Sequence, residues 1–459
     1  MFKKVLALAM SLVFCVTFSV GCNKKTGGGS NTTGDGDSGD LVRGEPITLT
    51  YASWEKDPFE EFMIQKFQEK YDWITVDSIS IDQNSWDAGL MQLADSHDLP
   101  DVFWCFNVAM STENGWTLDI TEYYDNDEYN KTIPEDLKKV GIYDGKRYGV
   151  AVHQFPWVIY LNKGLFEASN IEMPPYNWTF DDFVSAAKSL SVPGQYYFGI
   201  GNSQYYLHDI FPILYTDNLL DLGFDPKTET FNWDTRIKGL NTENTLINQK
   251  VMGVISSEEI EKAYGDASVW MPETNKIAMQ CDWFWTGTYL QSVVFTSQNI
   301  EWVAYPLPTG TSGGRQLSSV DCGAVSATTK HPREAYELLK FMNYGHDGWM
   351  AKIEYLKQQS NPIPTHLPIN VNDEEVMNEL KKILSGEDWA AVFESLKKSS
   401  PNVRYWLPGQ SEFWNWCEEQ EIYTKLTANE LKIEDVAPQL EQKLKEFYDQ
   451  SMTKIKARS

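Results

Sequence analysis

The chain has 459 residues, of which 39 are basic and 65 acidic, so its formal net charge at pH 7 is −26. A surface this acidic repels phosphate backbones and anionic lipid head groups, which argues against nucleic acid as a partner and against electrostatic docking on a membrane. The length exceeds what one simple hydrophobic core usually supports and predicts two domains.

The beginning of the chain has the pattern of an export signal. Two lysines precede an apolar stretch from Leu6 to Val20, which has the length of a signal-peptide core and is short for a membrane span. Cys22 follows, in a context that resembles a bacterial lipobox, although Ser19 stands where an aliphatic residue is usual. We therefore expect a signal peptide at 1–21 and a lipid on Cys22. The alternative is an ordinary signal peptide with an incidental cysteine.

The residues after Cys22 predict a flexible tether. Residues 23–40 contain no apolar side chain, so they cannot bury a core, and we assign the tether to 22–45. No later stretch is long and apolar enough to cross a bilayer. We expect the folded body to work outside the cytoplasm, attached to the cell membrane through its lipid alone.

The first predicted elements of the body alternate between strand and helix. Residues 47–53, 74–81 and 102–106 read as strands, while apolar residues at helical spacing over 59–71 and 86–93 predict two helices. This β-α-β-α-β order predicts a mostly parallel sheet with helices on its faces.

The later elements continue this alternation, and the end of the chain reads as helical. Further strands are predicted over 147–152, 157–161, 276–281, 301–305 and 323–327. One helix should begin at Thr179, where Thr-Phe-Asp-Asp has the form of a capping box, and another at Pro332, a residue favoured at the first helical position. From Asp373 to Lys456 the chain reads as helix, with breaks near Gly386 and at 401–409.

Four cysteines follow the signal region, at Cys105, Cys281, Cys322 and Cys417. Their irregular spacing contains no C-x-x-C pair and therefore no zinc or thioredoxin-like motif. One disulfide is compatible with an extracytoplasmic protein, and buried free thiols are an equal alternative. We expect neither a metal nor a cofactor.

Six short signatures occur in an order that resembles the bacterial extracellular solute-binding proteins of family 1, which mostly bind sugars and serve ABC importers. They are Trp54 before the first helix, LPDVFW at 99–104, YDGKRYGV at 143–150 with IYLNKGLFE at 159–167, WTFDDF at 178–183, NKIAM at 275–279 and KHPREA at 330–335. The signatures spread over about 300 residues, and SEFW at 411–414 resembles the entry to the family's C-terminal helix.

The resemblance implies an α/β, two-lobed periplasmic-binding-protein-like fold of type II, with the ligand in a cleft between lobes that are joined by a three-segment hinge. Hinge segments often carry proline, glycine or small residues, and we place the crossings near 153–158, 306–315 and 362–368. The N-terminal lobe then comprises 46–155 plus 310–362, and the C-terminal lobe comprises 158–305 plus 368–459.

The candidate ligand contacts come from segments that follow predicted strands, because ligands of open α/β sheets bind outside the carboxyl ends of the strands. Sugar sites combine aromatic faces with a few polar groups, and the chain offers 17 Trp, 23 Tyr and 22 Phe. We predict contacts from Asp282, Trp283, Phe284 and Trp285, then from Trp54, Glu55, Trp104, Phe106, Trp157, Gln154 and His153, and more weakly from Asp321, Arg404 and Trp406.

Each of these candidates has a structural alternative. Two of the three aromatic residues at 283–285 can pack inward, Trp54 can pack on the surface of its lobe, and a lone histidine such as His153 is more often structural than ligand-binding. Arg404 can simply pair with a carboxylate. Tyr205, Tyr206, His208 and Asp209 are further possible cleft residues without a motif behind them.

These observations predict a monomeric substrate-binding lipoprotein of an ABC importer. It would capture a neutral oligosaccharide by lobe closure, deliver it to the permease subunits and break no bond. The alternative is a cell-surface carbohydrate-active enzyme with an aromatic cleft, which two facing carboxylates would indicate. The chain has no G-x-S-x-G, H-E-x-x-H or P-loop motif. A signalling receptor is disfavoured because nothing in the body would relay a signal across the membrane.

Overall fold

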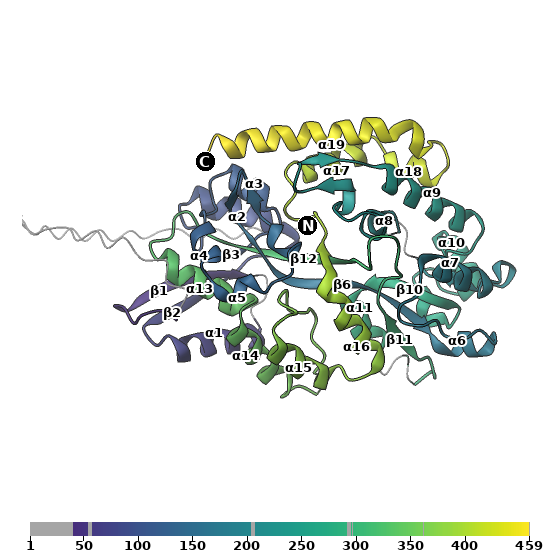
Figure 1. The fold of residues 1–459 in the computed structure, drawn as a ribbon, viewed down its shortest axis with the longest axis horizontal. Helices are drawn as coiled ribbons and strands as arrows, with labels where there is room; N and C mark the ends of the chain where they lie inside the picture. Colours follow the sequence, from purple (N-terminus) through teal and green to yellow (C-terminus); the bar gives the residue numbers. More distant parts are fainter. Residues whose placement is uncertain are drawn as a thin grey trace, which may run out of the picture. The chain divides into compact units, whose positions relative to one another are not determined.

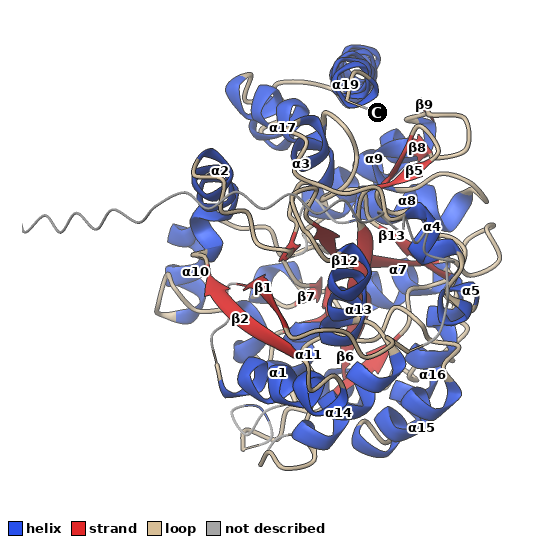
Figure 2. Ribbon diagram, turned by 90° about the vertical axis from the view of Figure 1, so that its left-hand side faces the viewer, coloured by secondary structure: helices blue, strands red, loops and turns tan. Residues whose placement is uncertain are grey.

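A computed structural model of the chain describes residues 40–53, 57–202, 207–291, 295, 297–360 and 362–458. The described residues form an α/β fold around a nine-stranded mixed sheet, with helices surrounding the central strands (Figures 1 and 2). The main path of the sheet has the order β2-β1-β3-β12-β6-β10-β7, with β11 paired to β6 and β13 to β12. The predicted signal peptide, Cys22, most of the tether, Trp54, Glu55, Tyr205 and Tyr206 lie outside the described residues.

The predicted β-α-β-α-β order at the start of the body is confirmed. Its elements are β1 (Ile47–Ser53), α1 (Pro58–Lys70), β2 (Ile74–Ser80), α2 (Trp86–Asp95) and β3 (Val102–Trp104). Strand β1 runs parallel to both β2 and β3. Helix α1 begins where the sequence favours a start, since the Asp57 side chain accepts a hydrogen bond from the Glu60 N–H and Pro58 occupies the first turn.

Strand β6 (Val150–Asn162) belongs to both halves of the sheet, which corrects the prediction of two separate extended segments at 147–152 and 157–161. Its first half pairs antiparallel with β12 (Gln316–Val325), up to Pro156 opposite Ser318. From Trp157 onward it pairs antiparallel with β10 (Ile277–Trp283), and it also pairs with β11 (Trp302–Tyr305). A proline within a strand pattern usually indicates that the strand ends there. Pro156 instead stands at the point where β6 changes partners.

A third segment lies beside β6 at the same place. Gln154 and Leu367 exchange two backbone hydrogen bonds of 3.1 and 2.9 Å, and the Gln154 side-chain nitrogen donates to the Pro368 carbonyl oxygen. The Gln154 side-chain oxygen accepts from the hydroxyls of Ser318 and Ser399. This buried glutamine therefore ties together β6, β12, β13 and the segment that follows α14.

The remaining elements do not simply alternate between strand and helix. Those before β12 are α3 (Val108–Glu113), α4 (Thr121–Asp125), α5 (Glu128–Lys131), β4 (Ile142–Tyr143), β5 (Lys146–Arg147), α6 (Lys163–Ala168), α7 (Phe180–Ser189), β7 (Phe198–Ile200), α8 (Leu207–Tyr215), β8 (Phe224–Asp225), β9 (Thr230–Phe231), α9 (Asp234–Asn248), α10 (Ser257–Tyr264) and α11 (Phe284–Leu290). Helices α3, α4 and α5 follow β3 in succession, and the hairpins β4-β5 and β8-β9 lie apart from the main sheet. The capping box of Thr179 with Asp182 at the start of α7 is confirmed.

The last third of the described chain is mainly helical. It contains α13 (Pro332–Asn343), α14 (His346–Leu356), α15 (Glu374–Ile383), α16 (Glu387–Ser395), β13 (Ser399–Pro401), α17 (Gln410–Glu419), α18 (Ile422–Thr427) and α19 (Ile433–Lys456). The sequence missed β13, a three-residue strand that has only β12 as its partner and so leaves no periodic pattern. All four described cysteines are buried free thiols.

The long helix α19 contacts elements at both ends of the described body (Figure 1). Near its start, the Asn241 side chain of α9 donates to Glu434 over 2.6 Å. Near its end, Lys454 forms an ion pair of 3.0 Å with Glu113 of α3. Helices α14, α15 and α16 also pack together against β6. One hydrophobic cluster contains Trp349 of α14, Trp389 of α16 and Val158 of β6.

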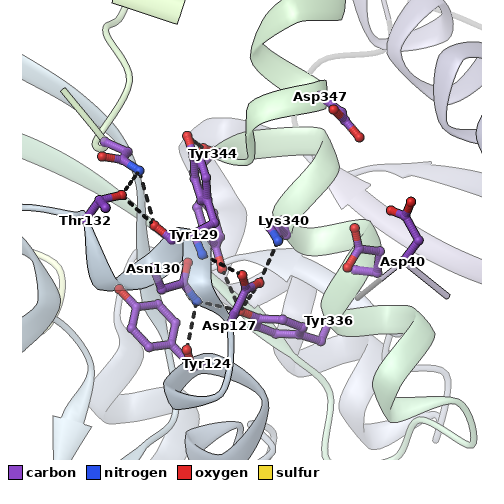
Figure 3. Close-up of polar contacts among 12 residues, drawn as sticks. Asp40, Tyr124, Asp127, Tyr129, Asn130, Thr132, Tyr336, Lys340, Tyr344 and Asp347 are labelled. Carbon is purple, nitrogen blue, oxygen red and sulfur yellow. Dashed lines mark hydrogen bonds and ion pairs between the residues drawn. The ribbon is translucent and has the colours of Figure 1, made fainter. Parts of the chain in front are cut away.

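A buried polar network joins the segment around α5 to α13 (Figure 3). The Tyr336 hydroxyl lies at its centre, where it accepts hydrogen bonds from Asn130 at 2.7 Å and from the Tyr344 hydroxyl at 3.2 Å, and donates to Asp127 at 3.4 Å. Lys340 forms an ion pair of 2.6 Å with the same carboxylate. Every one of the three Tyr336 contacts satisfies a polar group that water does not reach.

Replacing Tyr336 by phenylalanine is expected to lower the free energy of unfolding by about 1–3 kcal/mol, because it strands buried polar groups. Urea denaturation measures the change. Tyr123→Phe is the matched control, since the Tyr123 ring stacks on Tyr336 at 5.8 Å, and its loss of a half-buried hydroxyl should change stability by less than about 0.5 kcal/mol. Equal effects of the two substitutions would show that the network contributes nothing specific.

Candidate functional site

Two hollows lie beside the place where β6 changes partners. The first, which we call the histidine hollow, has a volume of about 420 Å³ and is lined by His153 and His366 together with parts of β1, α1 and α14. The second, the aspartate hollow, has a volume of about 500 Å³ and is lined by Asp209 and Asp221 together with residues 402–405 and the start of α17.

The two hollows share the same two sequence segments on their walls. Trp104 at the end of β3 lines the histidine hollow, and Phe106 lines the aspartate hollow. In the same way Trp285 lines the histidine hollow and Trp283 the aspartate hollow, with 5.7 Å between the centroids of the two indole rings. Four predicted contact residues are therefore arranged as two pairs, each of which has one member in each hollow.

Four aromatic rings form a row that connects the two hollows, and Trp157 is buried behind the other three. The Trp157 ring meets the Trp283 ring edge-on at 4.8 Å, and the Trp285 ring meets the Phe155 ring at 5.0 Å. Trp285 leaves 41% of its surface exposed, whereas Trp157 leaves only 2%. The inner rings thus support an outer ring whose face is accessible, and a sugar needs such a surface for stacking.

Two stacked imidazoles line the histidine hollow. The ring centroids of His153 and His366 lie 3.7 Å apart, and Lys352 lies with its amino nitrogen 2.7 Å from His366 Nε2. Burial, reinforced by His366 and Lys352, holds the pKa of His153 well below its usual range. Burial and Lys352 do the same to the pKa of His366. Both rings are therefore neutral at pH 7, and His366 Nε2 can accept from Lys352.

Asp321 and Trp104 complete the surroundings of His153. The Asp321 carboxylate lies 3.5 Å from His153 Nδ1, which is beyond good hydrogen-bond geometry. Among the described residues neither ring nitrogen of His153 has a hydrogen-bond partner. The Trp104 ring packs edge-on against His153 at 5.1 Å, and its N–H donates to the Tyr51 hydroxyl at 2.7 Å. Both ring nitrogens of His153 are therefore buried at the wall of the hollow and unsatisfied within the described part of the chain.

The aspartate hollow combines carboxyl groups with aromatic rings. Asp221 accepts the backbone N–H of Val403 at 2.7 Å. Burial and the nearby charge of Asp209 raise the pKa of Asp221 to about 8, which favours the protonated form of this carboxyl at pH 7. In the amide orientation that satisfies both of its neighbours, the Gln410 side-chain nitrogen donates to the Arg404 carbonyl oxygen. The Gln410 side-chain oxygen accepts from the Trp414 indole N–H and so orients that ring. Arg404 lies exposed at the rim.

Several other predicted contact residues lie away from these surfaces. Gln154, Trp157, Phe284 and Trp406 are buried, and the Trp406 indole N–H donates to the Asn402 carbonyl oxygen at 2.7 Å. Asp282 is half-buried, accepts from its own neighbour's N–H and from Gln280 at 3.2 Å, and has its pKa raised by burial. Ligand contacts from these five residues stay predictions.

Some residues of the hollows were missed by sequence reasoning. Lys352 and His366 come from α14 and the segment after it, and Asp221 and Trp414 come from parts of the chain without a strand before them. A usable signal existed only for Trp414, which belongs to the SEFW signature, and for His366, which lies in the third predicted crossing.

The described residues contain no group of three or more His, Cys, Asp or Glu side chains placed to hold a metal ion. None of the helices in the same part of the chain has the length and apolarity that a membrane span requires.

Comparison with known proteins places the chain among binding proteins. The family model of the bacterial extracellular solute-binding proteins matches residues 52–343, which is more than half of the chain. A protein of Brucella abortus (strain 2308), described only as a binding protein, is 24% identical over 324 residues, which cover 67% of this chain and 73% of that protein.

Solved structures show the same fold at lower sequence identity. An ABC substrate-binding protein of Listeria monocytogenes in complex with cycloalternan aligns with a TM-score of 0.63 and 19% identity, over 90% of this chain and 100% of that chain. The sugar-binding protein MalE of Xanthomonas citri aligns with a TM-score of 0.68 and 13% identity, over 88% and 98%. A sugar transporter protein of Rhizobium etli gives 0.66 and 15%, over 87% and 99%.

The raised pKa of Asp221 predicts a pH-dependent stability. Between the unfolded value near 3.9 and the folded value of about 8, the folded state binds more protons than the unfolded state, so stability falls as pH rises through this window. Asp221→Asn should remove this loss and raise the free energy of unfolding at pH 8 by about 1 kcal/mol or more, with no gain near pH 4. Urea unfolding at a series of pH values measures it.

Asp225→Asn is the control of opposite sign. The Asp225 side chain accepts from the Lys227 N–H and from Asn218, and although burial pushes in the other direction, these bonds hold its pKa below the usual range. Its replacement should therefore destabilise the protein at neutral pH. An Asp221→Asn variant that loses stability at pH 8 as Asp225→Asn does would contradict the assignment.

Proposed function

The chain belongs to the bacterial extracellular solute-binding protein family, and we propose that it is the substrate-binding lipoprotein of an ABC importer that captures a neutral oligosaccharide. The observation that carries this proposal is the pairing of aromatic residues across the two hollows. Trp104 and Phe106 on one segment, and Trp285 and Trp283 on the other, line both hollows in turn. A ligand long enough to contact both hollows would meet a ring from each segment in each of them.

The chemistry of the walls favours a neutral sugar. Aromatic faces bind the C–H surfaces of sugar rings, and scattered polar groups bind the hydroxyls. His153 and His366 are neutral at pH 7, and Asp221 favours its neutral form, because burial moves each pKa in the direction that removes charge. Among the solved relatives, the Listeria monocytogenes protein was crystallised with cycloalternan.

We propose that capture works by closure of two lobes about β6 and its neighbours. A ligand that contacts both lobes only in the closed state binds that state more tightly, and this difference in affinity shifts the population toward closure. The proposed lobes are 46–155 plus 310–362 and 158–305 plus 368–459. The closed form would then be recognised by the permease subunits of the importer.

One observation favours the alternative of a carbohydrate-active enzyme. Asp209 and Asp221 both line the aspartate hollow, and a protonated carboxyl beside a second carboxyl group is the pair that glycoside hydrolysis uses. Prolonged incubation of the protein with its ligand, followed by chromatography of the sugar, separates the two functions. Recovery of the intact sugar supports capture, and cleavage that Asp221→Asn abolishes would establish the enzyme.

Trp285→Ala is expected to weaken oligosaccharide binding at least 10-fold, which corresponds to about 1.4 kcal/mol, because it removes the accessible aromatic ring of the histidine hollow. Isothermal titration calorimetry measures the affinity. Tyr289→Ala is the matched control, since Tyr289 lies on the same helix, α11, with 42% of its surface exposed, compared with 41% for Trp285. Equal affinities of the two variants would rule out the stacking role.

The proposed lipid anchor has its own test. Cys22→Ser should abolish incorporation of labelled palmitate and release the folded protein from the membrane fraction into the soluble fraction, with unchanged ligand affinity. A variant that stays in the membrane fraction without palmitate would contradict the anchor and favour another form of attachment.

A further inference from the structure

A buried arginine fixes the position of Asp209 in the aspartate hollow. The Arg236 side chain on α9 is fully buried, and its Nη1 donates to Asp209 Oδ1. The guanidinium also lies over the Trp233 ring, 5.3 Å from its centroid. His208 Nε2 lies 3.6 Å from the same carboxylate oxygen. Arg236 therefore fixes the orientation of the Asp209 carboxylate at the first turn of α8.

The other oxygen of Asp209 receives no hydrogen bond from the described residues. The side chain keeps 27% of its surface exposed and lines the hollow. Its engaged oxygen, Oδ1, is bound to Arg236, so the second oxygen, Oδ2, is the acceptor that remains. A carboxylate oxygen that water can reach but no protein group occupies is ready to bind a ligand donor.

A second acceptor lies in the same hollow. Asn402 is 5% exposed, and its side-chain nitrogen donates to Ser319 Oγ at 3.1 Å. Its side-chain oxygen is buried and has no hydrogen-bond partner among the described residues, so a ligand donor would reach it only when the wall of the hollow adjusts on binding. A buried polar atom without a partner costs free energy, and a ligand donor would relieve that cost.

The local charges balance. The positive charge of Arg236 offsets the negative charge of Asp209, and Asp221 favours its neutral form at pH 7 because its pKa is raised to about 8. Among the described residues, an anionic group would find no buried cation at the hollow that is not already paired, because the other cation on its wall, Arg404, is exposed and screened by solvent. An ammonium group would find no net negative charge among the buried groups that the structure describes there. A neutral hydroxyl, which donates one hydrogen bond without bringing a charge, fits both acceptors.

We propose that Asp209 and Asn402 accept hydrogen bonds from hydroxyl groups of the ligand, and that Asp209 is a specificity-determining residue positioned by Arg236. This inference rests on the proposed capture of a neutral oligosaccharide and adds which hydroxyl acceptors select it. A sugar that lacks a hydroxyl at the position facing Asp209 would leave the carboxylate oxygen without a donor. The site would therefore discriminate strongly against that deoxy sugar.

The test begins with wild-type protein and neutral gluco-, xylo-, manno- and galacto-oligosaccharides in calorimetric titrations. Monodeoxy forms of the sugar that binds are then compared on the wild type and on Asp209→Asn. At one hydroxyl position the deoxy form should bind the wild type about 10- to 100-fold more weakly. The same deoxy form should show no more than a small further loss on Asp209→Asn, because the interaction is already removed.

Asp217→Asn is the matched control, since Asp217 is an exposed carboxylate just beyond α8 that lines neither hollow. It should bind every sugar as the wild type does. If Asp209→Asn fails to fold because Arg236 is left unpaired, the deoxy series on the wild type and on Asn402→Ser decides the question.

The possible outcomes separate the two ideas. Tight binding of a neutral sugar with equal losses for each deoxy form on Asp209→Asn and on the wild type would overturn the inference and leave the proposed function standing. The same holds if the wild type shows no deoxy position with a 10-fold loss. Absence of binding by any neutral sugar would overturn both.

Discussion

The hydrogen bonding of β6 is the constraint on which the rest of the structure depends. One continuous strand serves two partners, β12 up to Pro156 and β10 from Trp157 onward. The carboxyl ends of β3 and β10 thereby face the region where β12 begins. The aromatic segments that follow β3 and β10 can meet only because a single strand fixes both half-sheets, and the two hollows form between them.

The same place is reinforced from the side by the buried Gln154. Its backbone binds Leu367 and its side chain binds Pro368, Ser318 and Ser399. The amide satisfies groups from three crossing or neighbouring segments at once, so its burial costs little. Any motion between the proposed lobes must preserve or rearrange the hydrogen bonds of Gln154. It must also involve α19, because this helix contacts both α3 and α9. The proposed closure is therefore a change within a connected body, in which α19 and the α14–α16 cluster must adjust.

The hollows combine charged side chains, such as Asp321 and Lys352, with titratable groups whose charge burial removes or a buried partner offsets. Burial lowers the pKa of the two stacked histidines and raises that of Asp221, and the buried Arg236 offsets Asp209. The strongly acidic composition of the chain favours solubility. Aromatic faces lie beside polar and charged hydrogen-bonding groups at the site, which is a combination that suits the proposed oligosaccharide.

The sequence by itself determined the α/β class, the order of the first strands and helices, the capping box at Thr179 and membership of the solute-binding family. Each of these depends on residues that are neighbours along the chain, where periodicity and short signatures carry the information. The sequence also placed Trp104, Phe106, Trp283 and Trp285 correctly at or just after strand ends. It did not show which hollow each of them lines.

Only the tertiary structure decided that β6 is one strand with two partners, and that His366 stacks on His153 over a separation that no local pattern encodes. It alone joined Asp209 to Arg236 and left Asn402 with an unpaired oxygen. The physical reason is that burial, pairing and pKa are set by groups brought together across the fold. Short-range sequence patterns report what a segment prefers locally, but not which distant side chain will lie against it.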